Sequence, residues 1–168
     1  MTIFGTTIVV LGSWFLLAQG RLVAALFVIG IALLTDLLDG TMARISQEGA
    51  STWGNFLDST LDRISDGAVL LALTYYLYNE GDNLFIVAMI TIAVSSIVPY
   101  ARAKAESLNI ECKGGFAERT ERLVLLAFFG VLHIAGITWA LDLGVWLLLI
   151  LSALTVYQRM AIVWRATR

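Results

Sequence analysis

The chain of 168 residues has only one cysteine, one proline and one histidine. Because Cys112 has no second cysteine, a disulfide within the chain is excluded. Cys112 belongs to no metal-ligand motif and has no obvious base beside it that would make it a nucleophile. We interpret His133, which lies mid-span in Gly-Val-Leu-His-Ile-Ala-Gly, as a structural histidine hydrogen-bonded to a neighbouring helix.

Charged residues are also scarce, at 14% of the chain, whereas 59% of the residues are hydrophobic. The mean hydropathy is +0.84, which excludes a soluble globular domain. Apolar windows of about 20 residues predict membrane spans. The predicted spans lie near 3–18, 22–45, 54–78, 84–105, 118–138 and 144–165. Since the connections are short, we predict an all-α integral membrane protein in which residues 1–168 form a single six-transmembrane-helix bundle.

Basic residues gather on one side of the predicted spans. They are Arg44, Arg102, Lys104, Lys113, Arg119, Arg122, Arg159, Arg165 and Arg168. The opposite loops carry Arg21 alone, beside acidic residues. By the positive-inside rule we expect a multi-pass protein of the plasma membrane with both termini in the cytoplasm. The net charge of −2 gives no indication of a nucleic-acid partner.

Four aspartates lie in the most apolar part of the chain: Asp36, Asp39, Asp58 and Asp62. A carboxylate in hydrocarbon costs about 2.5 kcal/mol or more, so we expect them to face a polar cavity at the cytoplasmic end and to share cations. Their spacings of three and four residues place each pair on one face of a helix. Carboxylate oxygens suit Mg²⁺ or Mn²⁺. We predict two Mg²⁺ ions, with Mn²⁺ as the alternative, and phosphoryl transfer as the chemistry that such a pair supports.

Small residues accompany the aspartates. Gly40, Ala43 and Gly54 allow a flat group such as a nucleobase or a pyrophosphate to approach the helix backbone. The alternative is that these residues only permit close helix packing in a membrane. Their position beside four carboxylates favours the ligand.

The combined pattern resembles the signature of the CDP-alcohol phosphotransferases. Its residues are Asp36, Asp39, Gly40, Ala43, Arg44, Gly54, Asp58 and Asp62. The resemblance implies that an alcohol oxygen attacks the β-phosphate of a CDP-linked lipid and that CMP leaves. It extends to the six-span layout and implies a homodimer. The loop between Arg44 and Gly54 is one residue longer than usual, and little sequence precedes the first span.

The resemblance also implies individual roles. Asp36, Asp39 and Asp58 would be metal ligands, and Asp62 would be both a ligand and the general base. The cytidine would lie against Gly40, Ala43 and Gly54, with Arg44 or Thr52 at a phosphate or at the base. The alternative for Arg44 is a helix-end cation that offsets the helix dipole.

A second polar group indicates the acceptor. Arg119 lies near a predicted helix start, where the dipole disfavours a cation. Together with Arg122 and Arg159 it therefore predicts a pocket for a phosphate. Such a pocket predicts that the acceptor alcohol carries a phosphate group of its own. Plain alcohols such as serine are then excluded as acceptors.

The segments 61–69 and 117–123 resemble those of the actinobacterial phosphatidylinositol phosphate synthases, which join CDP-diacylglycerol to inositol 1-phosphate. By that resemblance Lys104, Arg119 and Arg159 would hold the acceptor phosphate, with Arg102 and Arg122 near by. Asp66 would bind inositol hydroxyls or pair with Arg63.

Two alternatives remain open at this point. A phosphatidylglycerol phosphate synthase uses glycerol 3-phosphate, and the arginines do not distinguish the two phosphorylated acceptors. A divalent cation transporter is disfavoured by the lack of paired repeats or broken helices. It is disfavoured also because the aspartates lie at the cytoplasmic end rather than near the midplane.

Overall fold

The computed structural model of the chain describes residues 3–31, 51–112, 115 and 118–168, and all the regular structure in these residues is helical. Chain order begins with α1, Ile3–Gly12, which continues as a short π-helix η1, Ser13–Leu17. A helix over Leu22–Ile31 follows. The remaining helices are α3, Thr52–Asn79; α4, Leu84–Ser107; α5, Arg119–Ile134; and α6, Ala140–Ala166. The all-α prediction is confirmed.

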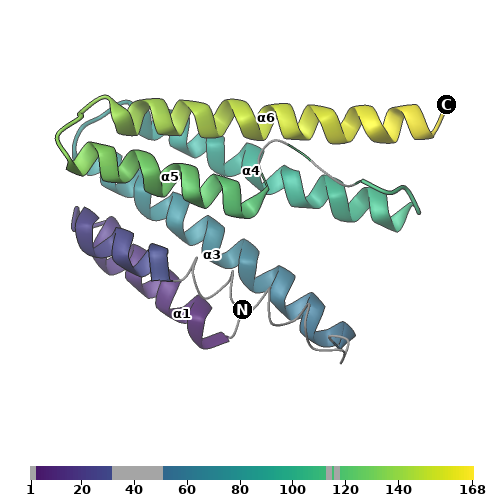
Figure 1. The fold of residues 1–168 in the computed structure, drawn as a ribbon, viewed down its shortest axis with the longest axis horizontal. Coiled ribbons are helices and arrows are strands. Elements are labelled where there is room, and N and C mark those ends of the chain that lie inside the picture. The colour runs from purple at the N-terminus through teal and green to yellow at the C-terminus, as the bar shows by residue number, and fades with distance from the viewer. Residues whose placement is uncertain (1–2, 32–50, 113–114, 116–117) are drawn as a thin grey trace.

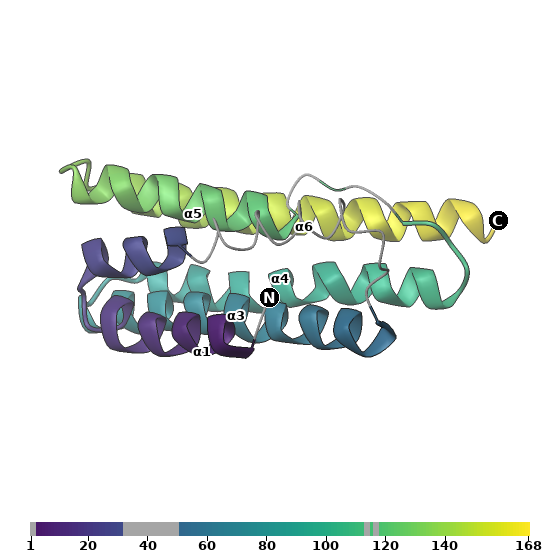
Figure 2. The same ribbon diagram turned by 60° about the horizontal axis from the view of Figure 1, so that its bottom comes forward.

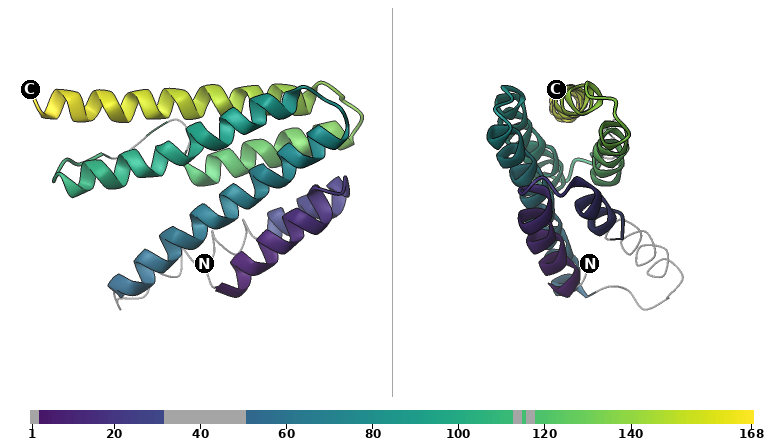
Figure 3. Two further views of the ribbon diagram at one scale, coloured as in Figure 1. Left: turned by 180° about the vertical axis from the view of Figure 1, so that it is seen from behind. Right: turned by 90° about the vertical axis from the view of Figure 1, so that its left-hand side faces the viewer.

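The helices form two layers. Figure 1 shows α3 and α4 running past one another, and α6 beside α5 along one edge. Figure 2 and the end-on view of Figure 3 show α1, α3 and α4 in one layer and α5 and α6 in the other. The layers are joined mainly through α4, which packs against both α3 and α6.

Two turns at one end of the molecule reverse the chain. Gly81, with φ 72°, follows α3, and Gly136, with φ 98°, follows α5. Glycine adopts this left-handed backbone without the steric penalty that a Cβ brings, so it ends a helix sharply. These turns set α3 antiparallel to α4 and α5 antiparallel to α6. The start of α3, the end of α4 and the end of α6 therefore lie away from these turns, and the shorter α5 begins about midway along α6 (Figure 1).

Within the described residues, α4 and α6 are long and apolar enough to cross a membrane. Their most apolar windows have mean hydropathies of 2.2 and 2.0, yet only 28% and 39% of those windows are buried. Large apolar side chains such as Ile86, Met89 and Ile97 are exposed instead. A helix that is apolar yet mostly uncovered suits hydrocarbon rather than water.

The buried core becomes polar toward the end of the molecule opposite the glycine turns. Deep in the bundle, α4 and α6 contribute small or apolar side chains such as Ala88, Val145 and Leu148. One to two turns further along, Ser95 of α4 and Ser152 of α6 are buried with their hydroxyl oxygens 3.2 Å apart. Small hydroxyl side chains let two helices approach closely and bond across the interface. The α4–α6 pair thus leads from an apolar core into a polar end.

Candidate active site

The acidic residues of α3 lie along one face. Asp58, Asp62 and Asp66 are four residues apart, which places them one above another on the helix. The helix begins after Ser51, whose hydroxyl oxygen accepts a hydrogen bond from the backbone N–H of Gly54 at 3.0 Å. This N-cap fixes where α3 starts and therefore the level of each carboxylate. The side chains of Asp62 and Asp66 are only 18% and 15% exposed.

The start of α5 is fixed by a capping box. The backbone N–H of Glu118 donates to Glu121 Oε2 at 2.9 Å, and the Glu118 side chain accepts from the backbone in return. Arg119 and Arg122 follow in the first turn, three residues apart on neighbouring positions of one face. A cation at a helix start is disfavoured by the helix dipole, so these arginines need anionic partners.

The arginines of α5 bind the carboxylates of α3. Arg119 Nη1 lies 3.2 Å from Asp62 Oδ1, and Arg119 Nε lies 3.1 Å from Asp66 Oδ1. Arg122 Nη2 lies 3.0 Å from Asp66 Oδ2. Each oxygen of Asp66 is thus held by a different arginine, whereas the sequence left Asp66 between inositol hydroxyls and Arg63. The pairs are largely removed from solvent, so they are stronger than surface pairs, but breaking one leaves an uncompensated charge.

Two arginines also bond to the backbone of α4. Arg122 Nη1 donates to the carbonyl oxygen of Ser95 at 3.1 Å, and Arg159 Nη1 donates to the carbonyl oxygen of Val98. Arg122 is 8% exposed and Arg159 is 3% exposed. Among the described residues no carboxylate forms an ion pair with Arg159. A buried guanidinium without a carboxylate partner is costly unless an anion compensates it.

These side chains surround a cavity of about 430 Å³. Its lining comes from α3, α4, the start of α5 and α6: Asn55, Ser59, Asp62, Arg63, Val98, Pro99, Arg102, Ala103, Glu106, Glu118, Arg119, Arg122 and Arg159. Five of these residues are arginines and three are carboxylates, so the cavity carries an excess of positive charge. A cleft with charge of one sign attracts ligands of the opposite sign.

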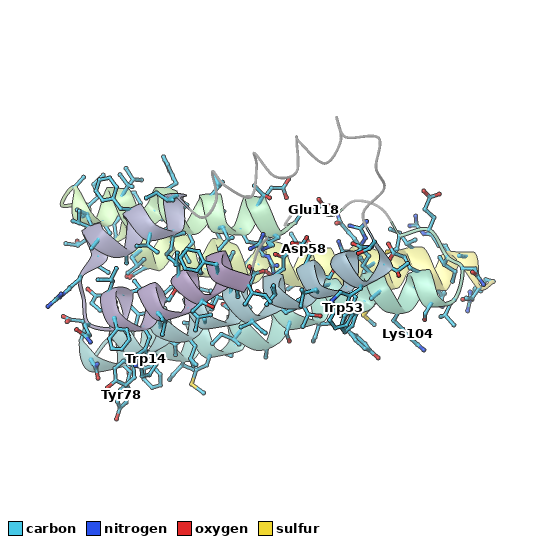
Figure 4. All side chains as sticks on the ribbon, turned by 90° about the horizontal axis from the view of Figure 1, so that it is seen from below. Trp14, Trp53, Asp58, Tyr78, Lys104 and Glu118 are labelled. Carbon is cyan, nitrogen blue, oxygen red and sulfur yellow. The ribbon has the colours of Figure 1, made fainter. Side chains whose placement is uncertain are left out.

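The structure brings together four of the five residues predicted to bind the acceptor phosphate. Arg102, Arg119, Arg122 and Arg159 line the cavity. Lys104 is exposed and is not part of the lining, and Figure 4 shows it well along toward the C-terminal end of α4. A role for Lys104 in phosphate binding stays a prediction.

Four of the nine residues predicted to bind the metals or the nucleotide are described. Asp58 and Asp62 lie one turn apart on α3, Thr52 is its first residue, and Gly54 lies in its first turn. Figure 4 shows Asp58 toward the middle of the molecule, on the part of α3 that faces away from the glycine turns. The other predicted residues lie outside the described part of the chain: Asp36, Asp39, Gly40, Ala43 and Arg44.

Within the ranges that the structure describes, no three His, Cys, Asp or Glu side chains converge as a metal site. Asp58 and Asp62 would therefore supply two of the four predicted metal ligands. Their carboxylate oxygens suit a divalent cation, and their helical spacing lets both bind the same one.

The sequence missed three residues of α3 that line the cavity: Asn55, Ser59 and Arg63. Asn55 and Ser59 precede Asp62 by seven and three residues, which is the spacing of one helix face, and Arg63 follows Ser59 by four. The spacing of Asn55 and Ser59 from Asp62 could therefore have predicted that these two side chains line the same cavity.

A second polar cavity, of about 400 Å³, lies at the end with the glycine turns and is lined in part by Glu80, Asp82, His133 and Asp142. His133 Nδ1 lies 3.2 Å from the carbonyl oxygen of Thr138. The partner of His133 is thus the α5–α6 turn rather than a neighbouring helix, which corrects the prediction. The histidine bonds to its own turn and lines the second cavity rather than the one that contains Asp62.

Comparisons with known proteins give a consistent result. The family model for CDP-alcohol phosphatidyltransferase matches residues 1–157. A phosphatidylinositol phosphate synthase of Mycobacterium tuberculosis is 39% identical over 169 residues, covering 98% of this chain and 77% of the relative. One of Streptomyces avermitilis is 36% identical over 175 residues, covering 98% and 71%.

Solved structures of the Mycobacterium tuberculosis phosphatidylinositol phosphate synthase are also similar. The structure with CDP-DAG bound has a TM-score of 0.87 and 37% identity, covering 96% of this chain and 83% of that one. The complex with manganese and citrate has a TM-score of 0.85 and 36% identity, covering 96% and 79%.

Proposed function

Because the chain belongs to the CDP-alcohol phosphatidyltransferase family, we propose that it transfers the phosphatidyl group of CDP-diacylglycerol to inositol 1-phosphate. The products are phosphatidylinositol phosphate and CMP. The observation that carries the proposal is the cavity in which four arginines predicted to bind a phosphate meet Asp62, the predicted base.

The cavity suits a small phosphorylated polyol. Its volume of about 430 Å³ lies in the usual range for small-molecule sites. The phosphate binds Arg119 and Arg159, with Arg102 and Arg122 close by, and Lys104 stays a predicted third ligand outside the cavity lining. Arg159 is the strongest support, because it is buried and the described residues give it only a carbonyl partner. Asn55 and Ser59 are available for hydroxyl groups of the acceptor.

Two divalent cations complete the donor site, with Mg²⁺ as the expected ion and Mn²⁺ as the alternative. The ligands are Asp36, Asp39, Asp58 and Asp62, whose carboxylate oxygens match both ions. A related enzyme was solved with manganese. When bound, the ions neutralise the pyrophosphate of the donor and the charge that develops on departing CMP.

The residues of the chain then perform the transfer. Asp62 accepts the proton of the attacking hydroxyl group, whose oxygen forms a bond to the β-phosphorus as the bond from that phosphorus to the CMP oxygen breaks. Arg119 contacts Asp62 and reaches into the same cavity, so it fixes the acceptor phosphate relative to the base. The cytidine lies against Gly40, Ala43 and Gly54, with Arg44 and Thr52 at its phosphates or base.

The proposed reaction on a lipid donor also suggests how the protein lies in the membrane. Residues 1–168 form one domain of six membrane spans, and the glycine turns face away from the cytoplasm. The site opens to the cytoplasmic leaflet of the plasma membrane, so the acyl chains of CDP-diacylglycerol stay among membrane lipids while the head group reaches the aspartates. Both termini are cytoplasmic, and the protein is a homodimer.

The product of the reaction tests the proposal. Purified protein is incubated with CDP-diacylglycerol, Mg²⁺ and inositol 1-phosphate carrying ¹⁸O in its hydroxyl groups, and the lipid product is analysed by mass spectrometry. We expect a lipid that keeps both phosphates and every ¹⁸O atom, because the hydroxyl oxygen attacks the phosphorus. A lipid without the second phosphate would contradict the proposed acceptor.

A further inference from the structure

The only proline of the chain, Pro99, lies inside α4. Proline has no backbone N–H, so it cannot donate to the carbonyl group four residues earlier, which is that of Ser95. In the interior of a membrane bundle a carbonyl group without a donor is costly, because no water is available to replace the bond. The Ser95 carbonyl therefore requires a donor from outside its own helix.

Arg122 of α5 supplies that donor. Its Nη1 lies 3.1 Å from the Ser95 oxygen, and the contact is buried. The side chain of Ser95 is fixed in turn, since its hydroxyl oxygen lies 3.2 Å from that of Ser152 on α6. The acceptor that Pro99 leaves free is thus held in a defined place by the α4–α6 contact.

The bond to Ser95 determines how Arg122 is oriented. The other end of its guanidinium group, Nη2, binds Asp66 Oδ2 at 3.0 Å, so the group is fixed between α3 and α4. The second oxygen of Asp66 binds Arg119 Nε at 3.1 Å. A chain of contacts therefore runs from the Ser95 carbonyl through Arg122 and Asp66 to Arg119.

We propose that Pro99 is a positioning residue for the acceptor-phosphate cavity: by leaving the Ser95 carbonyl free for Arg122, it sets the orientation of Arg122 and, through Asp66, that of Arg119. The inference rests on the proposed function, because the acceptor phosphate is the ligand of these arginines. Pro99 lines the same cavity, but its effect comes from its missing N–H.

The variant Pro99→Ala tests the idea, because alanine restores an N–H that competes with Arg122 for the Ser95 carbonyl. We expect the KM for inositol 1-phosphate to rise about 10-fold, and the KM for CDP-diacylglycerol and kcat to stay within about twofold. The thermal unfolding midpoint should not fall, since alanine favours a helix. A matched control is Ser96→Ala in the same turn, whose exposed hydroxyl donates to the Ala93 carbonyl and which should match the wild type throughout.

A double-mutant cycle separates the hydrogen bond from a general change in the shape of α4. In an Arg122→Lys background, Pro99→Ala should cause no further rise in the acceptor KM, because lysine cannot bridge Asp66 and the Ser95 carbonyl. Additive effects would overturn the positioning role, as would an unchanged acceptor KM in Pro99→Ala alone. Absence of turnover by the wild-type protein with both inositol 1-phosphate and glycerol 3-phosphate would instead contradict the proposed function. The positioning role of Pro99 would then be rejected as well.

Discussion

Arg119 Nη1 lies 3.2 Å from Asp62 Oδ1, so the first residue of α5 contacts the expected general base on α3. The same guanidinium group lines the acceptor cavity. One side chain therefore joins the place where the acceptor phosphate is expected to bind to the group expected to take its proton. Small displacements of Arg119 should affect acceptor binding first.

Arg119→Gln tests this relationship. Glutamine keeps much of the length but loses the charge, so we expect the KM for inositol 1-phosphate to rise at least about 10-fold. The KM for CDP-diacylglycerol should change much less. Steady-state kinetics with each substrate varied in turn measure both values. Arg165→Gln, at the exposed end of α6, is the charge-matched control; equal effects on the two substrates would reject the acceptor pocket.

Asp58→Asn and Asp62→Asn test the carboxylates of α3. Each replacement removes an anionic oxygen expected to bind a cation, so turnover should fall at least about 1,000-fold while the bundle stays folded. CMP release measures turnover, and thermal unfolding in detergent measures folding. Asp142→Asn, at the other end of the molecule, should keep normal activity. Normal activity in Asp58→Asn or Asp62→Asn would defeat the two-metal interpretation.

Asp66→Asn tests the buried ion pairs. It leaves Arg119 and Arg122 without the carboxylate that holds both, and losing one partner of a buried pair costs about 3 kcal/mol. We expect the free energy of unfolding to fall by about that amount in denaturant titrations and the acceptor KM to rise. Glu106→Gln is the comparison, because its pair with Arg102 is about half exposed and should cost under about 1 kcal/mol. Similar losses in the two variants would show that burial adds nothing.

Gly54→Ala tests the start of α3. A Cβ at Gly54 would lie 3.0 Å from the Ser51 hydroxyl oxygen, which caps the helix. We expect a loss of about 1 kcal/mol in unfolding free energy and a higher KM for CDP-diacylglycerol. Gly67→Ala in the same helix is the matched control, because no described atom beyond the nearby backbone of its own helix lies within 4 Å of its Cβ position. It should be neutral or stabilising by up to about 1 kcal/mol, and a Gly54→Ala protein that behaves alike would contradict the account.

Much of the fold could be predicted from hydropathy alone. The window 84–105 corresponds to α4, Leu84–Ser107, because the segment is strongly apolar and contains no glycine. The window 118–138 overshoots α5, which ends at Ile134 because Gly136 reverses the chain. The π-helical turn Ser13–Leu17 was not predicted, since a hydrophobicity window does not register how the backbone hydrogen bonds are spaced.

The residues of the site could be predicted from the sequence, but the ion pairs between them could not. Asp66 lies 53 residues from Arg119 and 56 from Arg122, so their contacts depend on how α3 packs against α5. Arg102 and Lys104 are a different case. The resemblance predicted both at one phosphate, although residues two apart point to different sides of a helix. The structure places Arg102 there and leaves Lys104 exposed.

The most direct test of the central claim is CMP release by the purified protein with CDP-diacylglycerol and Mg²⁺, comparing inositol 1-phosphate, glycerol 3-phosphate and free inositol as acceptors. The account predicts turnover with inositol 1-phosphate, none with free inositol, and loss of turnover when the cation is chelated. Turnover with glycerol 3-phosphate but not with inositol 1-phosphate would contradict the proposed acceptor and identify the protein as a phosphatidylglycerol phosphate synthase. Equal turnover with free inositol would contradict the phosphate-binding role of the arginine-lined cavity.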